Sequence, residues 1–140
     1  MIKKLLRPGN HNTFTSLGLL ILRVGLGAMM LTHGYPKFQK LLEGNFQFRD
    51  PIGLGVEASL ILAVLAEFVC SILLILGLFS RYALIPLIVT MAVALFIVHA
   101  SDPFGTQEKA ALYLLSFVFL FITGPGKNSI DQKLFGKRTF

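Results

Sequence analysis

A chain of 140 residues with a net charge of +6 is long enough for one domain. Hydrophobic residues make up 54% of it and charged residues 14%, whereas about a quarter of the residues in ordinary soluble domains are charged. The composition therefore excludes an ordinary soluble domain and indicates an integral membrane protein. The basic residues cluster at the chain ends and in one short loop, and no nucleic-acid-binding motif occurs, so we expect no nucleic-acid partner.

The first apolar segment, residues 14–33, is long enough to cross a membrane as a helix even though Arg23 interrupts it. Basic residues precede it, as they precede a cleaved signal peptide, but no small-residue cleavage site follows. We therefore expect this segment to stay in the protein as a membrane-spanning helix.

The connection that follows, residues 34–53, interleaves phenylalanine, leucine and isoleucine with charged residues. Such a segment either lies in the membrane interface or packs as a loop on the helix ends. The sequence leaves both alternatives open.

Three further apolar segments, residues 54–79, 82–100 and 108–123, complete a predicted set of four membrane-spanning helices. The last is short, and a Gly-Pro-Gly sequence directly after it ends the helix. The sequence thus predicts an all-α fold, an integral membrane four-helix bundle that forms one domain over residues 1–140.

The distribution of lysine and arginine predicts how the bundle crosses the membrane. Eight of these residues lie in the two chain ends and in the connection between the second and third segments, but only four lie on the opposite side. By the positive-inside rule, we expect both the N-terminus and the C-terminus in the cytoplasm.

Arg23 and Glu67 are expected to form a buried charge pair near the middle of the membrane. At about 1.5 Å per residue, Arg23 lies about 13 Å and Glu67 about 18 Å from the cytoplasmic side. An unpaired arginine at this depth costs about 2.5–3.5 kcal/mol on insertion scales, and a carboxylate partner would offset much of that.

Small residues accompany the predicted pair on both helices. The same face of the first helix carries Gly27, Met30 and Gly34, and that of the second carries Cys70 and Ser71. Because small residues let helices approach closely in a membrane, we expect these two faces to pack against each other. Cys70 is then a small buried residue.

Titratable residues also gather toward the extracytoplasmic ends of the four segments. They are His33, Lys37, Glu57, His99 and Glu108. Charged groups near membrane depth usually point inward and mark a ligand or proton path, so these residues form a candidate ligand-binding layer. Alternatively they are helix-end structure, because a carboxylate in a first helical turn interacts favourably with the helix dipole. Two histidines without a spacing motif do not indicate a metal site.

Four stretches of the sequence together resemble the DoxX family of small bacterial membrane proteins. They are LRVGLGAMMLTHGYPK, LAEFVCSILLILGLFSR, an apolar segment that ends at His99 and is followed by Glu108 and LYLLSF, and TGPGKNSID. The resemblance implies a four-helix bundle in the bacterial inner membrane. The residues of this chain that match recurring positions of the family are Arg23, Glu67, His33, Gly34, Lys37, His99 and Glu108.

The last stretch ends in Asp131. We expect this carboxylate to bond to backbone N–H groups or to Arg81, without a catalytic role.

The DoxX resemblance also implies a class of function. The family takes its name from subunits linked to quinol oxidase and thiosulfate:quinone oxidoreductase systems. It therefore implies a quinone- or lipid-binding subunit or accessory of a membrane redox system, with a quinone as the candidate cofactor and a protein of that system as the candidate partner. The single cysteine provides no CxxC pair for dithiol chemistry.

Two other functions remain open. One is a non-enzymatic scaffold or assembly factor of a membrane complex, and the other is a small transporter, for which four helices are few unless the chain forms a homo-oligomer. The sequence does not decide whether the chain is an enzyme.

Overall fold

The computed structural model describes residues 5–136, and every regular element in that range is a helix. The helices are α2 (Thr13–Leu42), α3 (Val56–Val64), η1 (Leu65–Val69), α4 (Cys70–Leu76), α5 (Ser80–Val93), η2 (Ala94–Val98), α6 (Phe104–Thr123) and α7 (Ile130–Phe135). The elements η1 and η2 are π-helical turns within longer helices. The predicted all-α fold is confirmed.

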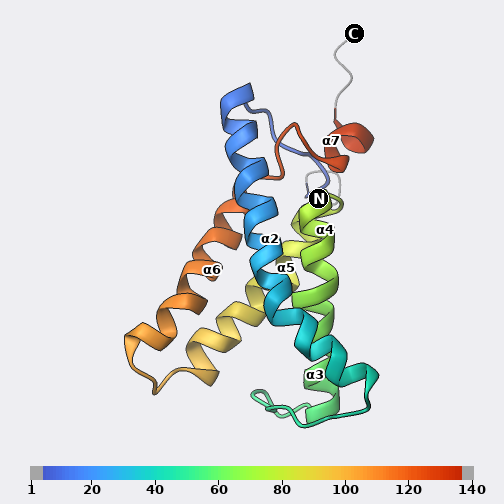
Figure 1. The fold of residues 1–140 in the computed structure, drawn as a ribbon. Helices are drawn as coiled ribbons and strands as arrows, with labels where there is room; N and C mark the ends of the chain where they lie inside the picture. Colours follow the sequence, from blue (N-terminus) through green and yellow to red (C-terminus); the bar gives the residue numbers. More distant parts are fainter. Residues whose placement is uncertain (1–4, 137–140) are drawn as a thin grey trace.

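In the described range 5–136, four continuous helices are long and apolar enough to cross a membrane. They run over Thr13–Leu42, Val56–Leu76, Ser80–Val98 and Phe104–Thr123. The first packs along η1 and α4, and α5 packs along α6 (Figure 1). The predicted four-helix membrane bundle is confirmed as well.

The bundle has two different ends. We call the terminal end the one that carries the segment before α2, the turn between α4 and α5, and α7. The cavity end carries residues 43–55 and residues 99–103, and there the α5–α6 pair diverges from α2 and α3 (Figure 1). The two described ends of the chain meet at the terminal end, where the Gly126 N–H donates to the Pro8 carbonyl over 3.2 Å. Which side of the membrane this end faces stays a prediction.

The first helix is longer than predicted, because α2 runs past residue 33 and ends at Leu42. Pro36 lies inside this continuation, and membrane helices tolerate proline where neighbouring groups compensate for the lost hydrogen bond. Phe38 anchors the continuation by stacking on Phe68, with ring centroids 4.4 Å apart. The connection between the first two spans is therefore residues 43–55, shorter than expected.

The small residues on α2 face the second span as predicted. A Cβ atom added at Gly27 would lie 2.5 Å from Ile75 Cγ1 and 3.1 Å from the Ser71 carbonyl oxygen. One added at Gly34 would lie 2.5 Å from the carbonyl group of Glu67. The two helix backbones thus approach so closely that only glycine fits between them.

Asp131 closes the terminal end through backbone N–H groups, which is one of the two expected arrangements. Its carboxylate accepts hydrogen bonds from the Phe79 N–H at 2.7 Å and the Ser80 N–H at 2.9 Å. These are orphan donors at the start of α5, where a negative charge also interacts favourably with the helix dipole.

The expected pair between Arg23 and Glu67 does not form, and this prediction is wrong. The Arg23 guanidinium donates instead to the carbonyls of Pro125 and Asn128, each at 2.8 Å, in the turn after α6. Helical side chains lean toward the N-terminus of their own helix. Because α2 begins at the terminal end and α3 at the cavity end, Arg23 and Glu67 lean in opposite directions.

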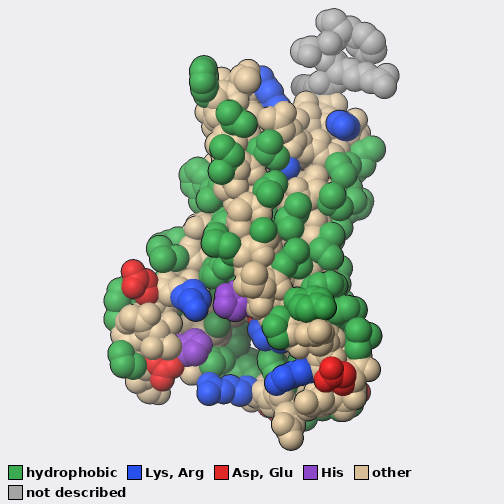
Figure 2. Space-filling view, viewed as in Figure 1, with side chains coloured by type: hydrophobic (Ala, Val, Ile, Leu, Met, Phe, Trp, Pro, Cys, Tyr) green, Lys and Arg blue, Asp and Glu red, His purple; other side chains and the backbone are tan. Residues whose placement is uncertain are grey.

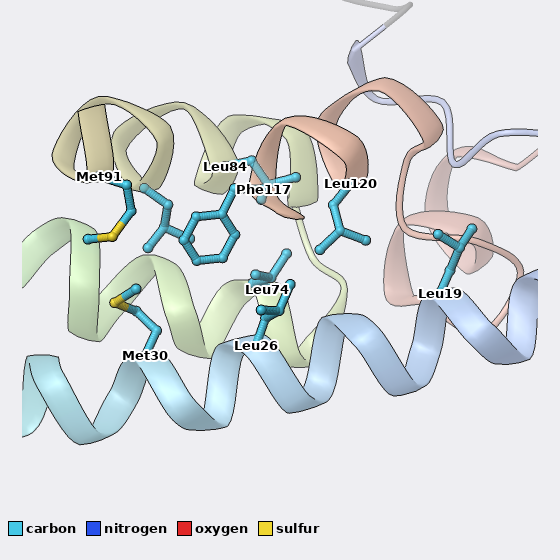
Figure 3. Close-up of a cluster of buried hydrophobic side chains, with 9 residues drawn as sticks. Leu19, Leu26, Met30, Leu74, Leu84, Met91, Phe117 and Leu120 are labelled. Carbon is cyan, nitrogen blue, oxygen red and sulfur yellow. The ribbon is translucent and has the colours of Figure 1, made fainter. Parts of the chain in front are cut away.

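A cluster of buried apolar side chains separates the two ends. It joins α2, α4, α5 and α6 through Leu19, Leu26, Met30, Leu74, Leu84, Leu87, Met91, Phe117 and Leu120. In Figure 3, Leu19 lies at one end of the cluster and Met30 and Met91 lie at the other. In a membrane such contacts stabilise the bundle through close packing, since lipid tails are as apolar as the side chains themselves.

Candidate functional site

Two cavities lie at the cavity end of the bundle. The larger has a volume of about 660 Å³ and the smaller a volume of about 470 Å³. Lys37, Glu67, Ala94 and His99 line both, so the two cavities are neighbours around a shared wall. Figure 2 shows a hollow here, bordered by lysine, arginine and histidine side chains and floored by apolar ones.

An ion pair between Lys37 and Glu67 lies in the shared wall. The Lys37 Nζ donates to the Glu67 Oε2, and the Glu67 side chain is only 5% exposed. A carboxylate this buried in a membrane protein is costly without a partner, so Lys37 is what makes Glu67 tolerable there. The Lys37 Nζ also lies 5.9 Å from the centroid of the Phe48 ring, within cation–π range.

Both sides of the cavities contain a π-helical turn. Glu67 lies in η1, and η2 ends directly before His99, whose backbone N–H donates to the Ala94 carbonyl over 2.9 Å. Such turns are rare, and they occur frequently at functional sites. Here they set the direction of two polar side chains at the cavities.

His99 is held from behind by the loop that follows it. Its Nδ1 lies 2.6 Å from the Asp102 Oδ2. The Gln107 side chain donates to the backbone carbonyls of His99 and Asp102, each at 2.9 Å, and so fixes this loop. A carboxylate on one ring nitrogen orients the imidazole and leaves the other nitrogen for a ligand or a proton.

His33 lies one helical turn before Lys37 and lines the smaller cavity. Its ring meets that of Tyr113 edge to face, with centroids 6.0 Å apart. Tyr113 and Lys109 bring α6 into the same cavity. The site is thus assembled from all four membrane-spanning helices.

Residues 18–100 match the family model DoxX. The chain belongs to the DoxX family. It is 36% identical to a Haemophilus influenzae protein described as uncharacterised, over 85% of this chain and 92% of that protein. It is 29% identical to an uncharacterised membrane protein of Mycobacterium tuberculosis, over 86% of this chain and 83% of that protein. It is also 29% identical to the inner membrane protein YphA of Escherichia coli, over 82% of this chain and 89% of that protein.

No solved structure matches the chain. The family and the four apolar helices together make this DoxX protein a multi-pass membrane protein in contact with lipid. The predicted location in a bacterial inner membrane agrees with the name of the Escherichia coli relative.

The structure brings three of the five predicted layer residues of this DoxX protein together. His33, Lys37 and His99 line the cavities, whereas Glu57 and Glu108 are exposed and line neither. Glu57 lies in the first turn of α3, which fits the alternative that it interacts with the helix dipole. Glu108 does not lie in the first turn of its helix, because α6 begins at Phe104 and not at residue 108 as predicted.

Four charged residues that line the cavities were not predicted from the sequence to belong to this site. Glu67 was assigned to a pair with Arg23, and the basic residues Lys40, Arg49 and Lys109 were not singled out. The sequence feature that could have indicated Lys40 and Arg49 is the mixture of apolar and charged residues in the predicted connection, residues 34–53. Lys109 follows Glu108 directly, but successive residues point about 100° apart around a helix, and only Lys109 lines a cavity.

Within residues 5–136, no group of three or more His, Cys, Asp and Glu side chains could hold a metal ion. Cys70 is partly buried and lines neither cavity. The chemistry that the lining residues offer is therefore hydrogen bonding, proton exchange and charge pairing.

Proposed function

We propose that this DoxX protein binds the head group of a quinone or lipid at the cavity end and acts as a subunit or accessory of a membrane redox system. The observation that carries the proposal is the Lys37–Glu67 pair in the shared wall of two cavities. Charged groups at membrane depth that border open volume usually mark a ligand or proton path.

The residues around the pair match the needs of such a head group. A quinone oxygen needs hydrogen-bond donors, and its reduction or oxidation needs groups that exchange protons. Lys37, His33 and His99 supply donors, and histidine exchanges protons near neutral pH. The apolar side chains of Leu62, Val89 and neighbouring residues line the larger cavity and can receive a tail.

The redox part of the proposal rests on the DoxX family, whose name comes from quinone-linked systems. The binding part rests on the site alone. The two parts therefore need separate tests. Binding is tested first, because the proposed redox role depends on a ligand bound at the cavity end.

The test is mass spectrometry of small molecules extracted from the full chain in native-like membrane discs, compared with bulk membrane extract. We expect a quinone or one lipid species to be enriched, and less of it to be retained after His33→Ala or His99→Ala. Glu108→Gln is the matched control, because Glu108 lines neither cavity. Enrichment of nothing, or equal retention by all variants, would reject the proposal in favour of a scaffold role.

A further inference from the structure

We infer that the cavity end selects an anionic membrane lipid, a phospholipid with a negatively charged head group that Lys40, Arg49 and Lys109 hold at the rim. This inference rests on the proposed function, since it names the ligand class of the same site.

The lining of the cavities carries an excess of positive charge. Lys40 and Arg49 line the larger cavity, Lys109 lines the smaller one, and Lys37 and Glu67 line both. Since Lys37 and Glu67 neutralise each other, three cations remain without an acidic partner in the lining.

Two acidic residues in the loops at this end, Asp50 and Asp102, are engaged by other groups. Asp50 accepts hydrogen bonds from the N–H groups of Leu54 and Gly55, each at 2.9 Å, and from the Ser59 hydroxyl at 3.0 Å. Asp102 is bonded to His99. Neither acid lines a cavity, and neither forms an ion pair with Lys40, Arg49 or Lys109.

The unmatched cations have donors to spare. The side chains of Arg49 and Lys109 form no hydrogen bond or ion pair with any other residue in the described range 5–136. The Lys40 Nζ donates to the Gln47 carbonyl over 3.2 Å, and an ammonium group has two further donors. Guanidinium and ammonium groups are the usual protein partners of phosphate oxygens.

The walls below this rim are apolar. Leu62, Ala63 and Ala66 line the larger cavity from the second span, and Val89 and Val93 line it from the third. Its volume of about 660 Å³ falls in the range of roughly 300–1,000 Å³ typical of ligand pockets. A basic rim above an apolar wall fits an amphiphile with a negative head and a hydrocarbon tail.

A neutral quinone gains less from this arrangement. Its oxygens accept hydrogen bonds but carry no charge that three cations would attract. Free inorganic phosphate has the charge but no group for the apolar wall. The lipid is the ligand class that uses both features.

The experiment places the full chain in discs of phosphatidylcholine that contain a small fraction of phosphatidylglycerol, and native mass spectrometry counts the retained lipids. We expect phosphatidylglycerol to be enriched around the protein over its fraction in the disc. The variant with Arg49→Gln and Lys109→Gln should lose about fivefold in enrichment for each basic residue removed. The control variant carries Lys127→Gln and Lys133→Gln, which remove the same charge from exposed positions at the terminal end.

Equal loss of enrichment in both double variants would overturn the inference, because the lipid would then respond to net charge alone. Calorimetric binding of inorganic phosphate in pure phosphatidylcholine discs, with no enrichment of phosphatidylglycerol, would overturn it too. Retention of a quinone that co-purifies with the protein and that phosphatidylglycerol does not displace would reject the anionic lipid and keep the proposed function. Retention of no molecule would reject both.

Discussion

The charged residues buried at the two ends of the bundle have different kinds of partner, whereas the exposed Asp50 at the cavity end bonds to main-chain groups as well. At the terminal end, Arg23, Arg81 and Asp131 bond to main-chain carbonyl and N–H groups of turns and helix ends. At the cavity end, Lys37 and Glu67 bond to each other's side chains beside open volume. A buried charged residue in a membrane protein can therefore either stabilise the fold or mark a binding site, and the type of its partner distinguishes the two roles.

The physical basis of the difference is what each partner can do. A main-chain carbonyl cannot titrate or move away without unfolding its turn, so a charge bound to it belongs to the fold. A side-chain partner can rotate and be exchanged for a ligand group of the same charge. We thus expect substitutions at the terminal end to lower stability first and those at the cavity end to lower ligand retention first.

The largest expected effect belongs to Arg23. Arg23→Leu leaves the carbonyls of Pro125 and Asn128 without donors, and each hydrogen bond to a charged group contributes about 1.5–3 kcal/mol. We expect the free energy of unfolding in mixed micelles to fall by about 3 kcal/mol or more. The exposed Lys127 provides the control, since Lys127→Leu should change it by less than about 0.5 kcal/mol. Similar losses for both would contradict a structural role for Arg23.

Two double-mutant cycles test the partners directly. Substitutions Lys37→Met and Glu67→Gln should be coupled by about 1–3 kcal/mol, because their side chains are in contact. Substitutions Arg23→Leu and Glu67→Gln should be additive within about 0.5 kcal/mol, because they share no partner. Both cycles use chemical unfolding of the full chain. Coupling in the second cycle but not in the first would restore the pairing predicted from the sequence.

Gly34 tests whether the cavity end depends on close helix contact. Gly34→Ala forces its Cβ to within 2.5 Å of the Glu67 carbonyl, so α2 and η1 must move apart and stability should fall by about 1–3 kcal/mol. The matched control is Gly25→Ala on the same helix, where nothing lies within 4 Å of the new atom. It should leave stability unchanged or raise it by up to about 1 kcal/mol. Thermal unfolding of both variants is the measurement, and equal effects would refute the contact.

The smallest effect concerns the connection at the cavity end. The backbone N–H of Gly55, then the Ser59 hydroxyl and the N–H of Leu54, hold the pKa of Asp50 below its ordinary value, although burial acts in the opposite direction. A lowered pKa means that the carboxylate stabilises this connection above its ordinary pKa and loses that effect as the pH falls through the lowered value.

Hydrogen exchange of the Leu54 and Gly55 amides measures this effect. After correction for intrinsic rates, protection should be lower at about pH 3 than at about pH 6. In Asp50→Asn, protection should be weaker and should no longer change between the two pH values. A pH dependence that persists in this variant would assign it to another group.

Much of the fold could be predicted because lipid imposes simple rules. Four apolar segments must be helices to satisfy their backbones, and the Gly-Pro-Gly sequence ends the last one at Thr123. The length of α2 could not be predicted in this way, since Gly34 and Pro36 favour a helix end on local grounds. Contacts with the second span, such as the stacking of Phe38 on Phe68, override that preference.

The candidate site was predictable only in part. Counting residues gives depth in the membrane but not the direction of a long side chain, so Arg23 and Glu67 were matched by depth although they lean apart. The π-helical turn at Glu67 has no signature in residue types, and it changes which side of the helix faces α2. His33 and Lys37 were found because both lie near the predicted extracytoplasmic end of the first segment.

The two π-helical turns have a consequence for the way this bundle tolerates changes of length. Each π-helical turn contains one residue more than an α-helical turn, and the helix continues through it. The residues after the turn are therefore rotated about the helix axis by about 100° relative to an uninterrupted α-helix. Deleting one residue in η1 would convert the π-helical turn into an α-helical one and rotate α3 relative to α4 about their common axis. If Cys70–Leu76 kept its packing, the residues before the deletion, including those that line the larger cavity, would turn toward the hydrocarbon. The cavities at this end of the molecule thus depend on the rotation of α3 relative to α4 as well as on the side chains that line them.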